Sequence, residues 1–166
     1  MPSREWLSLP MEIREAIEAH QFEAPVKIGA IAREMELEMK AATLAPGISG
    51  EIRPNGVEQG RFVIRINRHD PSRRQRFTAA HELAHYLLHR DHIGSGIEDD
   101  VLYRSSLSDR REAEANRLAA DILMPEELVQ EILETARTLK VENPVEYLAD
   151  QFEVSEAAMK IRLGIS

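Results

Sequence analysis

The segment RFTAAHELAHYLLHR, residues 76–90, decides how this chain is built. Its apolar residues recur three and four positions apart, which is the spacing of one face of a helix. An aspartate–proline pair just upstream supplies an N-cap and a proline for the first turn, so we predict a helix over residues 71–89. Its apolar face is interrupted by His81, Glu82 and His85. Burying three such groups without a ligand would be unfavourable, so they mark a candidate site.

The motif His81-Glu82-x-x-His85 has the spacing of a catalytic metal site. Residues four apart project from the same helix face about 6 Å apart along the axis, so the two imidazoles can bind one ion. Glu82 lies beside the first ligand, close enough to activate an attacking water without binding the metal. We therefore predict a hydrolytic Zn²⁺ site, with Mn²⁺ as the alternative ion, in which His81 and His85 are ligands and Glu82 is catalytic.

A catalytic zinc usually has three protein ligands and one open position, so a third ligand must come from elsewhere in the chain. His89 lies four residues beyond His85, but it is about 12 Å from His81 along the helix axis, so one ion cannot bind both. We expect His89 to be a helix-end histidine that the helix dipole favours. No HxxGxxH continuation follows His85, which excludes the metzincin arrangement.

A second predicted helix, residues 109–123, offers the third ligand. Glu112 and Glu114 point about 160° apart on it, so the neighbours of each distinguish them. Glu112 shares its face with small residues suited to close packing against the motif helix, whereas Glu114 aligns with charged residues at the edge of a solvated face. We choose Glu112. Asn116 then either hydrogen-bonds to a ligating group or is a polar residue at a helix packing boundary.

The composition is that of a soluble globular protein. The 166 residues suffice for one domain with a small appendage, and 43% are hydrophobic and 30% charged. The chain has no cysteine, which excludes thiolate catalysis, disulfides and iron–sulfur clusters and leaves His, Asp and Glu as metal ligands. A net charge of −8 argues against general nucleic-acid binding. The N-terminus lacks the apolar core of a signal peptide, and no run approaches the roughly 20 apolar residues of a membrane span, so we expect a cytoplasmic protein.

The remaining pattern predicts an α+β fold. We expect a minimal zincin-like core over residues 1–140, with the motif helix packed on a small antiparallel three-stranded sheet, and a helix-turn-helix-like appendage over residues 141–166. Residues 37–44 fit a strand or a helix equally well. The clear strands are expected at residues 48–53 and 61–67, and further helices at residues 8–20, 25–35, 125–139, 144–151 and 155–163.

Attack on a peptide carbonyl also needs a donor for the developing oxyanion. Tyr103, His92 and Arg104 lie in or just after the loop between the two metal-binding helices, and we choose Tyr103, although ordinary packing also explains it. A basic strip just before the motif either guides an acidic substrate segment or is a solvated helix face. This strip consists of Arg68, Arg73, Arg74 and Arg76.

The tail LADQFEVSEAAMKIRL, residues 148–163, has apolar residues at the spacing typical of a helix-turn-helix. DNA recognition requires cationic residues on the second helix of such a motif. In this tail, acidic residues balance Lys160 and Arg162. We therefore expect the tail to dock or pack rather than bind nucleic acid directly.

These segments together resemble a known family. The order of ISGEI, FVIRIN, RRQRFTAAHELAHYLLH and REAEANRLAADILMP, over roughly residues 25–125, resembles the ImmA/IrrE family of bacterial metallo-endopeptidases, which are gluzincin-like HExxH zincins. The tail is similar to the helical segment that follows the peptidase core in that family. The HExxH alone would indicate only a zincin, and the separate ExxAN block makes the match specific. The resemblance implies that His81, His85 and Glu112 are the metal ligands and Glu82 the catalytic glutamate.

The resemblance also implies a biological role. Members of this family cleave a cognate helix-turn-helix (XRE-type) transcriptional repressor and so derepress stress or mobile-element genes. The implied partner is a protein substrate, such as a repressor encoded next to this chain, and no membrane is involved. The family usually has glycine where this chain has Ala84, a small-for-small change. Two other hypotheses remain: a non-proteolytic regulatory or toxin–antitoxin binding module with a structural metal site, and a DNA-binding regulator that acts through the tail.

Overall fold

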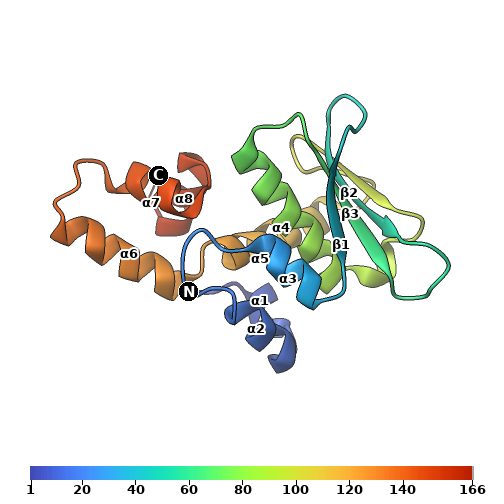
Figure 1. The fold of residues 1–166 in the computed structure, drawn as a ribbon, viewed down its shortest axis with the longest axis horizontal. Coiled ribbons are helices and arrows are strands. Elements are labelled where there is room, and N and C mark those ends of the chain that lie inside the picture. Colours follow the sequence, from blue (N-terminus) through green and yellow to red (C-terminus); the bar gives the residue numbers. More distant parts are fainter. Residues whose placement is uncertain (166) are drawn as a thin grey trace.

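A long helix, α4 (Ser72–Leu88), lies at the centre of the molecule and carries the HExxH motif (Figure 1). The computed structural model describes residues 1–165 of the chain. A β-sheet and the helix α5 (Asp109–Leu123) both pack against α4. The buried residues of α4 run from Thr78 to His85, so the motif lies in the interior. Neither α4 nor any other described helix is long and apolar enough to cross a membrane.

The sheet is mixed, which corrects part of the predicted fold. Within residues 1–165 its strands are β1 (Glu38–Ala42), β2 (Ile48–Pro54), β3 (Phe62–Asn67) and β4 (Ile97–Asp100), in the order β1-β3-β2-β4. β2 pairs antiparallel with β3 and β4, whereas β1 runs parallel to β3. The α+β class and the two clear strands are confirmed, but the three-stranded antiparallel sheet is wrong.

The two edge strands explain this error. Residues 37–44, which fitted a strand or a helix, contain β1, and this strand follows α3 (Ile28–Glu34) closely enough to enter the sheet parallel to β3. Ile97–Asp100 forms β4 inside a segment that we predicted to be a loop. A strand of four residues has too few positions to show alternation in the sequence. Its hydrogen bonds to β2 create it, and these depend on the tertiary structure.

β2 approaches α4 closely at Gly50. An ideal Cβ atom at Gly50 would overlap Thr78 Cγ2 and would lie 3.4 Å from Glu82 Cγ. Thr78 and Glu82 are both fully buried, so neither side chain can turn out to solvent. Because glycine has no Cβ, the sheet can contact the motif helix directly beside the candidate site.

Small side chains also bring α5 close to α4. Ala80 and Ala84 of α4 and Ala115 and Ala119 of α5 are all fully buried. The α5 alanines lie on the same face as Glu112, and this face packs against the motif helix. The backbone separation that these alanines permit allows a carboxylate on α5 to reach the histidines on α4.

The N-terminal residues form two short helices instead of the single helix predicted over residues 8–20. These are α1 (Arg4–Ser8) and α2 (Met11–Glu18). The break lies at Pro10, because the residue before a proline is disfavoured in the helical conformation, and Leu9 is indeed extended.

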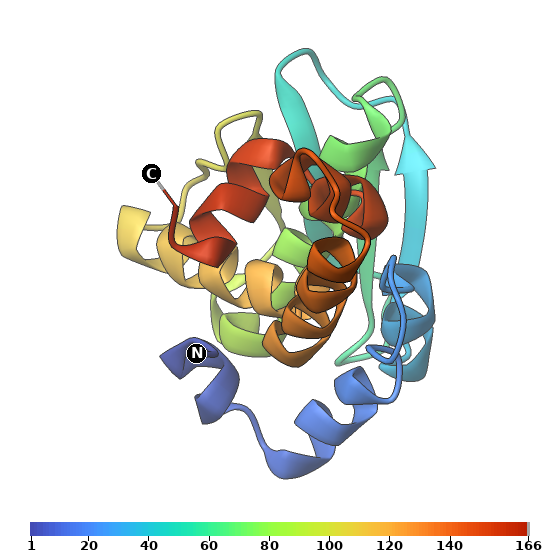
Figure 2. The same cartoon turned by 90° about the vertical axis from the view of Figure 1, so that its left-hand side faces the viewer.

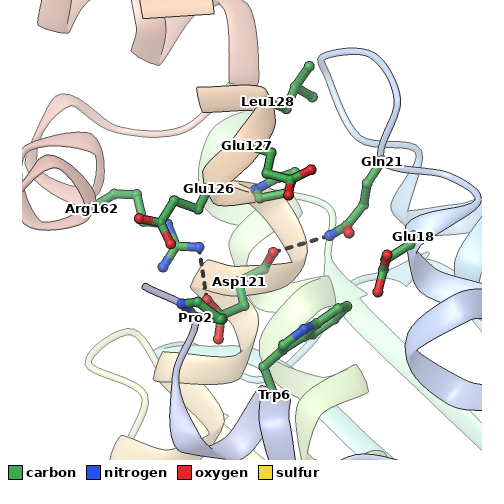
Figure 3. Close-up of a pocket in the computed structure, with 10 residues that line it drawn as sticks. Pro2, Trp6, Glu18, Gln21, Asp121, Glu126, Glu127, Leu128 and Arg162 are labelled. Atoms are coloured by element: carbon green, nitrogen blue, oxygen red, sulfur yellow. Dashed lines mark hydrogen bonds and ion pairs between the residues drawn. The ribbon is translucent and has the colours of Figure 1, made fainter. Parts of the chain in front are cut away.

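The N-terminal segment is anchored to α5 by polar contacts. Ser3 donates its backbone N–H and its hydroxyl to Asp121. Arg117 binds both oxygens of Glu5, and this interaction lowers the pKa of the Glu5 carboxyl to about 2. Figure 3 shows Asp121 beside Arg162 of the tail, with which it forms an ion pair at 2.8 Å. Asp121 is only 3% exposed, so the predicted solvated face is covered at this position, whereas the Arg117 side chain on the same face is 42% exposed.

The C-terminal helices α6 (Glu126–Thr138), α7 (Pro144–Phe152) and α8 (Glu156–Leu163) fold back onto the core. In Figure 2 this orange and red tail faces the viewer. Arg73 of α4 donates to the carbonyl of Val154 at 2.8 Å, which fixes the α7–α8 turn to the motif helix. The boundary at residue 140 between core and appendage stays a prediction.

Gly50→Ala should lower the free energy of unfolding by roughly 1–3 kcal/mol, because the added methyl group overlaps Thr78 Cγ2 in a packed interior. Urea unfolding of the metal-free protein, followed by circular dichroism, measures the change. The double variant Gly50→Ala, Thr78→Ser should recover most of the loss because serine lacks the clashing methyl group, with Thr78→Ser alone as the control. Equal stability of Gly50→Ala and wild type would show that the close approach tolerates a side chain.

Candidate metal centre

Four ionisable side chains from three elements meet in the interior. His81 and His85 come from α4, Asp99 from β4 and Glu112 from α5. One ligand atom of each residue lies within 4.8 Å of those of the other three. His81, His85 and Asp99 are fully buried, and Glu112 is 5% exposed. The structure therefore brings the three predicted ligands together and adds Asp99, which the sequence analysis missed.

The distances among these groups match those around a tetrahedral ion. Glu112 places one carboxylate oxygen 3.1 Å from His81 Nε2 and the other 3.1 Å from His85 Nε2. Asp99 places its two oxygens 3.5 Å from the same two nitrogens. Ligand atoms about 2.0–2.1 Å from a tetrahedral zinc lie about 3.3–3.4 Å from one another. The donor set is therefore of the right chemistry and size for one zinc-like ion.

Unpaired polar atoms point to the same conclusion. Among residues 1–165, His85 Nε2 and both carboxylate oxygens of Asp99 and of Glu82 are buried without a hydrogen-bond partner. Buried polar atoms are normally paired, and a group left unpaired is destabilising. A divalent cation would satisfy His85 and Asp99, and a water held beside it would satisfy Glu82. The residues present thus fit a metal ion.

Asn116 orients the first histidine. Its Oδ1 atom lies 2.8 Å from His81 Nδ1, so His81 donates the Nδ1 proton to it. In the neutral imidazole the lone pair is then on Nε2, the nitrogen that faces Glu112 and Asp99. A partner of this kind fixes both the ring orientation and the tautomer of a metal-binding histidine.

His89 orients the second histidine in the same way. His85 Nδ1 lies 3.0 Å from His89 Nδ1, and His89 Nε2 lies 3.1 Å from Glu114. If Glu114 accepts from His89 Nε2, then His89 Nδ1 accepts from His85, and His85 Nε2 is free to bind an ion. His89 is the C-cap residue of α4, so the prediction of a helix-end histidine is confirmed. It is also buried, with 5% of its surface exposed, and burial lowers its pKa.

The groups of the centre shift one another's pKa values. Burial lowers the pKa of His81, but the carboxylates of Asp99 and Glu112 outweigh it and raise this pKa to about 9. The same carboxylates outweigh burial at His85 and raise its pKa as well. Burial raises the pKa of Glu82 well above its usual range, and Asp99 raises it further. A divalent cation would displace protons from this centre as it binds.

Comparison with known proteins identifies the family. Residues 47–164 match the peptidase family described as the IrrE N-terminal-like domain. This range contains both metal-site helices and β4. The chain belongs to this peptidase family. The match agrees with the resemblance that the HExxH and ExxAN segments indicated.

One protein is similar to this chain in sequence, and one solved structure is similar to it in fold alone. The radiation response metalloprotease IrrE of Deinococcus radiodurans is 40% identical over 95 residues, which are 54% of this chain and 29% of that protein. A transcriptional regulator of Mycobacterium tuberculosis has the same fold, with a TM-score of 0.55 and 18% identity over 98% of this chain and 48% of its own. The chain therefore spans less than half the length of each relative.

Tyr103 lies beside the centre in this family member, but its hydroxyl already has a partner. The ring centroid is 4.9 Å from that of His81, and the hydroxyl lies 3.2 Å from Thr78 Oγ1. Its role as an oxyanion donor stays a prediction. The alternatives His92 and Arg104 likewise stay predictions.

The basic strip before the motif is not a free surface. Its side chains reach backbone carbonyls of other segments and so hold the structure together. Arg73 and Arg76 also form ion pairs with Asp150 and Glu153 of the tail. The expectation of a solvated helix face is therefore wrong for Arg76, whose side chain is 18% exposed, whereas the Arg73 side chain is 39% exposed. The remaining acceptors are the carbonyls of Ala41 for Arg68, Val101 for Arg74 and Val26 for Arg76.

Asp99 was missed because its strand was missed. Within β4, Ile97 and Asp99 are buried while Glu98 is exposed. The run Ile-Glu-Asp-Asp is polar and follows a glycine-containing loop, so the sequence favoured a turn. The only available signal was the spacing of Asp99 two residues after Ile97, which would place both on one face of a strand. This signal is too weak to select Asp99 over its acidic neighbours Glu98 and Asp100.

Asn116→Leu should weaken Zn²⁺ binding about 10–100-fold, because it removes the acceptor that holds His81 in the metal-binding tautomer. Competition against a chelating dye measures the affinity. Asn116→Asp is the matched control, because it keeps an acceptor oxygen and should stay close to wild type or bind more tightly. If leucine leaves the affinity unchanged, Asn116 acts only as a polar residue at the helix packing boundary.

Proposed function

We propose that this chain is a metal-dependent endopeptidase in which His81, His85 and Glu112 hold a Zn²⁺ ion and Glu82 is the catalytic acid–base. The arrangement that supports this most directly is the meeting of both histidine Nε2 atoms with the Glu112 carboxylate beside an unpaired, buried Glu82. Nitrogen and carboxylate ligands favour zinc, and Mn²⁺ is the alternative ion.

In the proposed mechanism the side chains have separate tasks. When bound, the ion would polarise the scissile carbonyl and the attacking water. Glu82 accepts the proton of that water and then passes it to the leaving amine. Burial raises the pKa of the Glu82 carboxyl, which favours its acceptance of that proton. Asn116 and His89 keep the two imidazoles in the tautomer that the ion requires.

We propose as substrate one exposed site in a helix-turn-helix (XRE-type) repressor, whose loss would derepress stress or mobile-element genes. The support is the resemblance to the ImmA/IrrE family together with the burial of the centre. His81, Glu82, His85 and Asp99 are all fully buried, so an arbitrary peptide does not reach them. Such a site suits a selective regulatory protease of the cytoplasm better than a digestive one.

A second candidate is a non-proteolytic binding module with a structural metal site. One observation favours it: Asp99, His81, His85 and Glu112 together supply four donors at tetrahedral distances. Structural zinc sites are filled by four protein ligands, whereas catalytic ones keep a position open.

Glu82→Gln should reduce cleavage of the adjacent-encoded repressor about 10²–10⁴-fold while metal binding stays near wild type, because the amide cannot take a proton from water. Incubation of purified protein, Zn²⁺ and repressor, followed by gels and mass spectrometry of the fragments, measures this. Glu131→Gln, an exposed glutamate on α6, is the matched control and should cleave normally.

Chelation of the wild-type protein should stop cleavage, and added Zn²⁺ should restore it. The proposal fails if Glu82→Gln still removes the repressor from co-expressing cells and relieves repression. That outcome would favour the binding module.

A further inference from the structure

Residues 93–105, here called the strap, cover one side of the metal centre. The strap contains β4 and supplies Asp99 to the cluster. Tyr103 of the strap lays its ring against His81, and Ser105 donates to Glu112 Oε2 at 3.0 Å. Three of its residues therefore contact three of the residues that we assign to the centre.

Asp99 faces the same two histidine nitrogens as Glu112. Its two oxygens lie 3.5 Å from those nitrogens. Asp99 has no exposed surface, and among the described residues neither of its oxygens has a hydrogen-bond partner. If both histidines and one oxygen of each carboxylate held a zinc ion, all four of its usual positions would be filled and none would be left for water or a carbonyl.

We propose that Asp99 is a displaceable fourth metal ligand, which holds the centre in a latent state until the strap moves away. This inference rests on the proposed peptidase function and adds a step of regulation to it. A protein partner that engages the strap would remove Asp99 and open the fourth position in the same event. Proteolysis would then depend on recognition of the partner, not only on access to a peptide bond.

In the described part of the chain, the strap is attached to the sheet along one side only, and the buried side chains of Ile93 and Ile97 anchor it in the core. β4 lies at the edge of the sheet, pairs with β2 alone in residues 1–165, and has an irregular register between Ile48 and Gly50. Gly94 and Gly96 precede it with φ values of +56° and +146°, and glycine changes such conformations easily. Val101 and Leu102, just after β4, are exposed and offer an apolar contact to a partner.

A groove already reaches the outer side of the strap. It has a volume of about 910 Å³, and Val101, Tyr103, Phe77 and Asn116 are among its lining residues. Tyr103 and Asn116 each contact His81 from this side. Outward movement of the strap would therefore join the groove to the metal centre.

The test uses the full chain loaded with Co²⁺, whose visible absorption reports changes in its ligands, and acetohydroxamate as a small metal-binding probe. Asp99→Ala should bind the probe at least about tenfold more tightly than wild type, as expected if the open state is a minor population in the wild type. Its affinity for Co²⁺ should fall about 10–100-fold. Glu98→Ala, an equal change of charge at the exposed neighbouring position of β4, should match wild type in both measurements.

Asp99→Asn provides a second variant of unchanged shape, in case the alanine variant does not fold. It should lie between wild type and Asp99→Ala in probe binding. The proposal is overturned if the wild type binds acetohydroxamate as tightly as both Asp99 variants, because the fourth position is then open already. It is also overturned if both variants fold and bind Co²⁺ with the wild-type affinity.

These outcomes are separate from those that test proteolysis. Gain of probe binding by Asp99→Ala, with no Glu82-dependent cleavage of any candidate repressor, would support the displaceable ligand and contradict the peptidase function. Glu82-dependent cleavage, with equal probe binding by wild type and variants, would support the peptidase and contradict the latent state.

Discussion

This structure depends on three carboxylates that are buried together beside the two histidines of the motif. Glu82, Asp99 and Glu112 surround two imidazoles in a region that water does not reach. Charges buried in this way are stable only when they are paired, protonated or bound to a cation. These carboxylates raise the pKa values of both histidines. A divalent cation would neutralise the same negative charge more fully than two protonated imidazoles.

Close backbone packing makes this concentration of charge achievable. Gly50 lets β2 contact α4 beside Glu82, and buried alanines let α5 approach from another side. Larger residues at these places would move Glu112 away from the histidines, since an interior is packed too densely to absorb extra volume. The residues that shape the centre are therefore small and carry no chemistry of their own.

Hydrogen bonds from neighbouring residues set the ring orientation and the tautomer of each imidazole. Asn116 comes from α5, and Glu114, which holds His89, lies two residues earlier on the same helix. One helix thus carries Glu112 and the hydrogen-bond partners that orient both histidines, so the position of α5 relative to α4 sets the geometry of the whole centre. The strap is attached less extensively than α5, because β4 is an edge strand and two glycines precede it. The proposed regulation would act at the strap.

The sequence by itself determined the motif helix, the two clear strands and the face of the second helix on which Glu112 lies. Each depends on local periodicity, which fixes the side of a helix or strand on which a residue lies. Only the tertiary structure decided that Asp99 joins the centre, that His89 supports His85, and that β1 enters the sheet in parallel. These features depend on contacts between segments far apart in the chain. The periodicity of one segment contains no information about the element that packs against it.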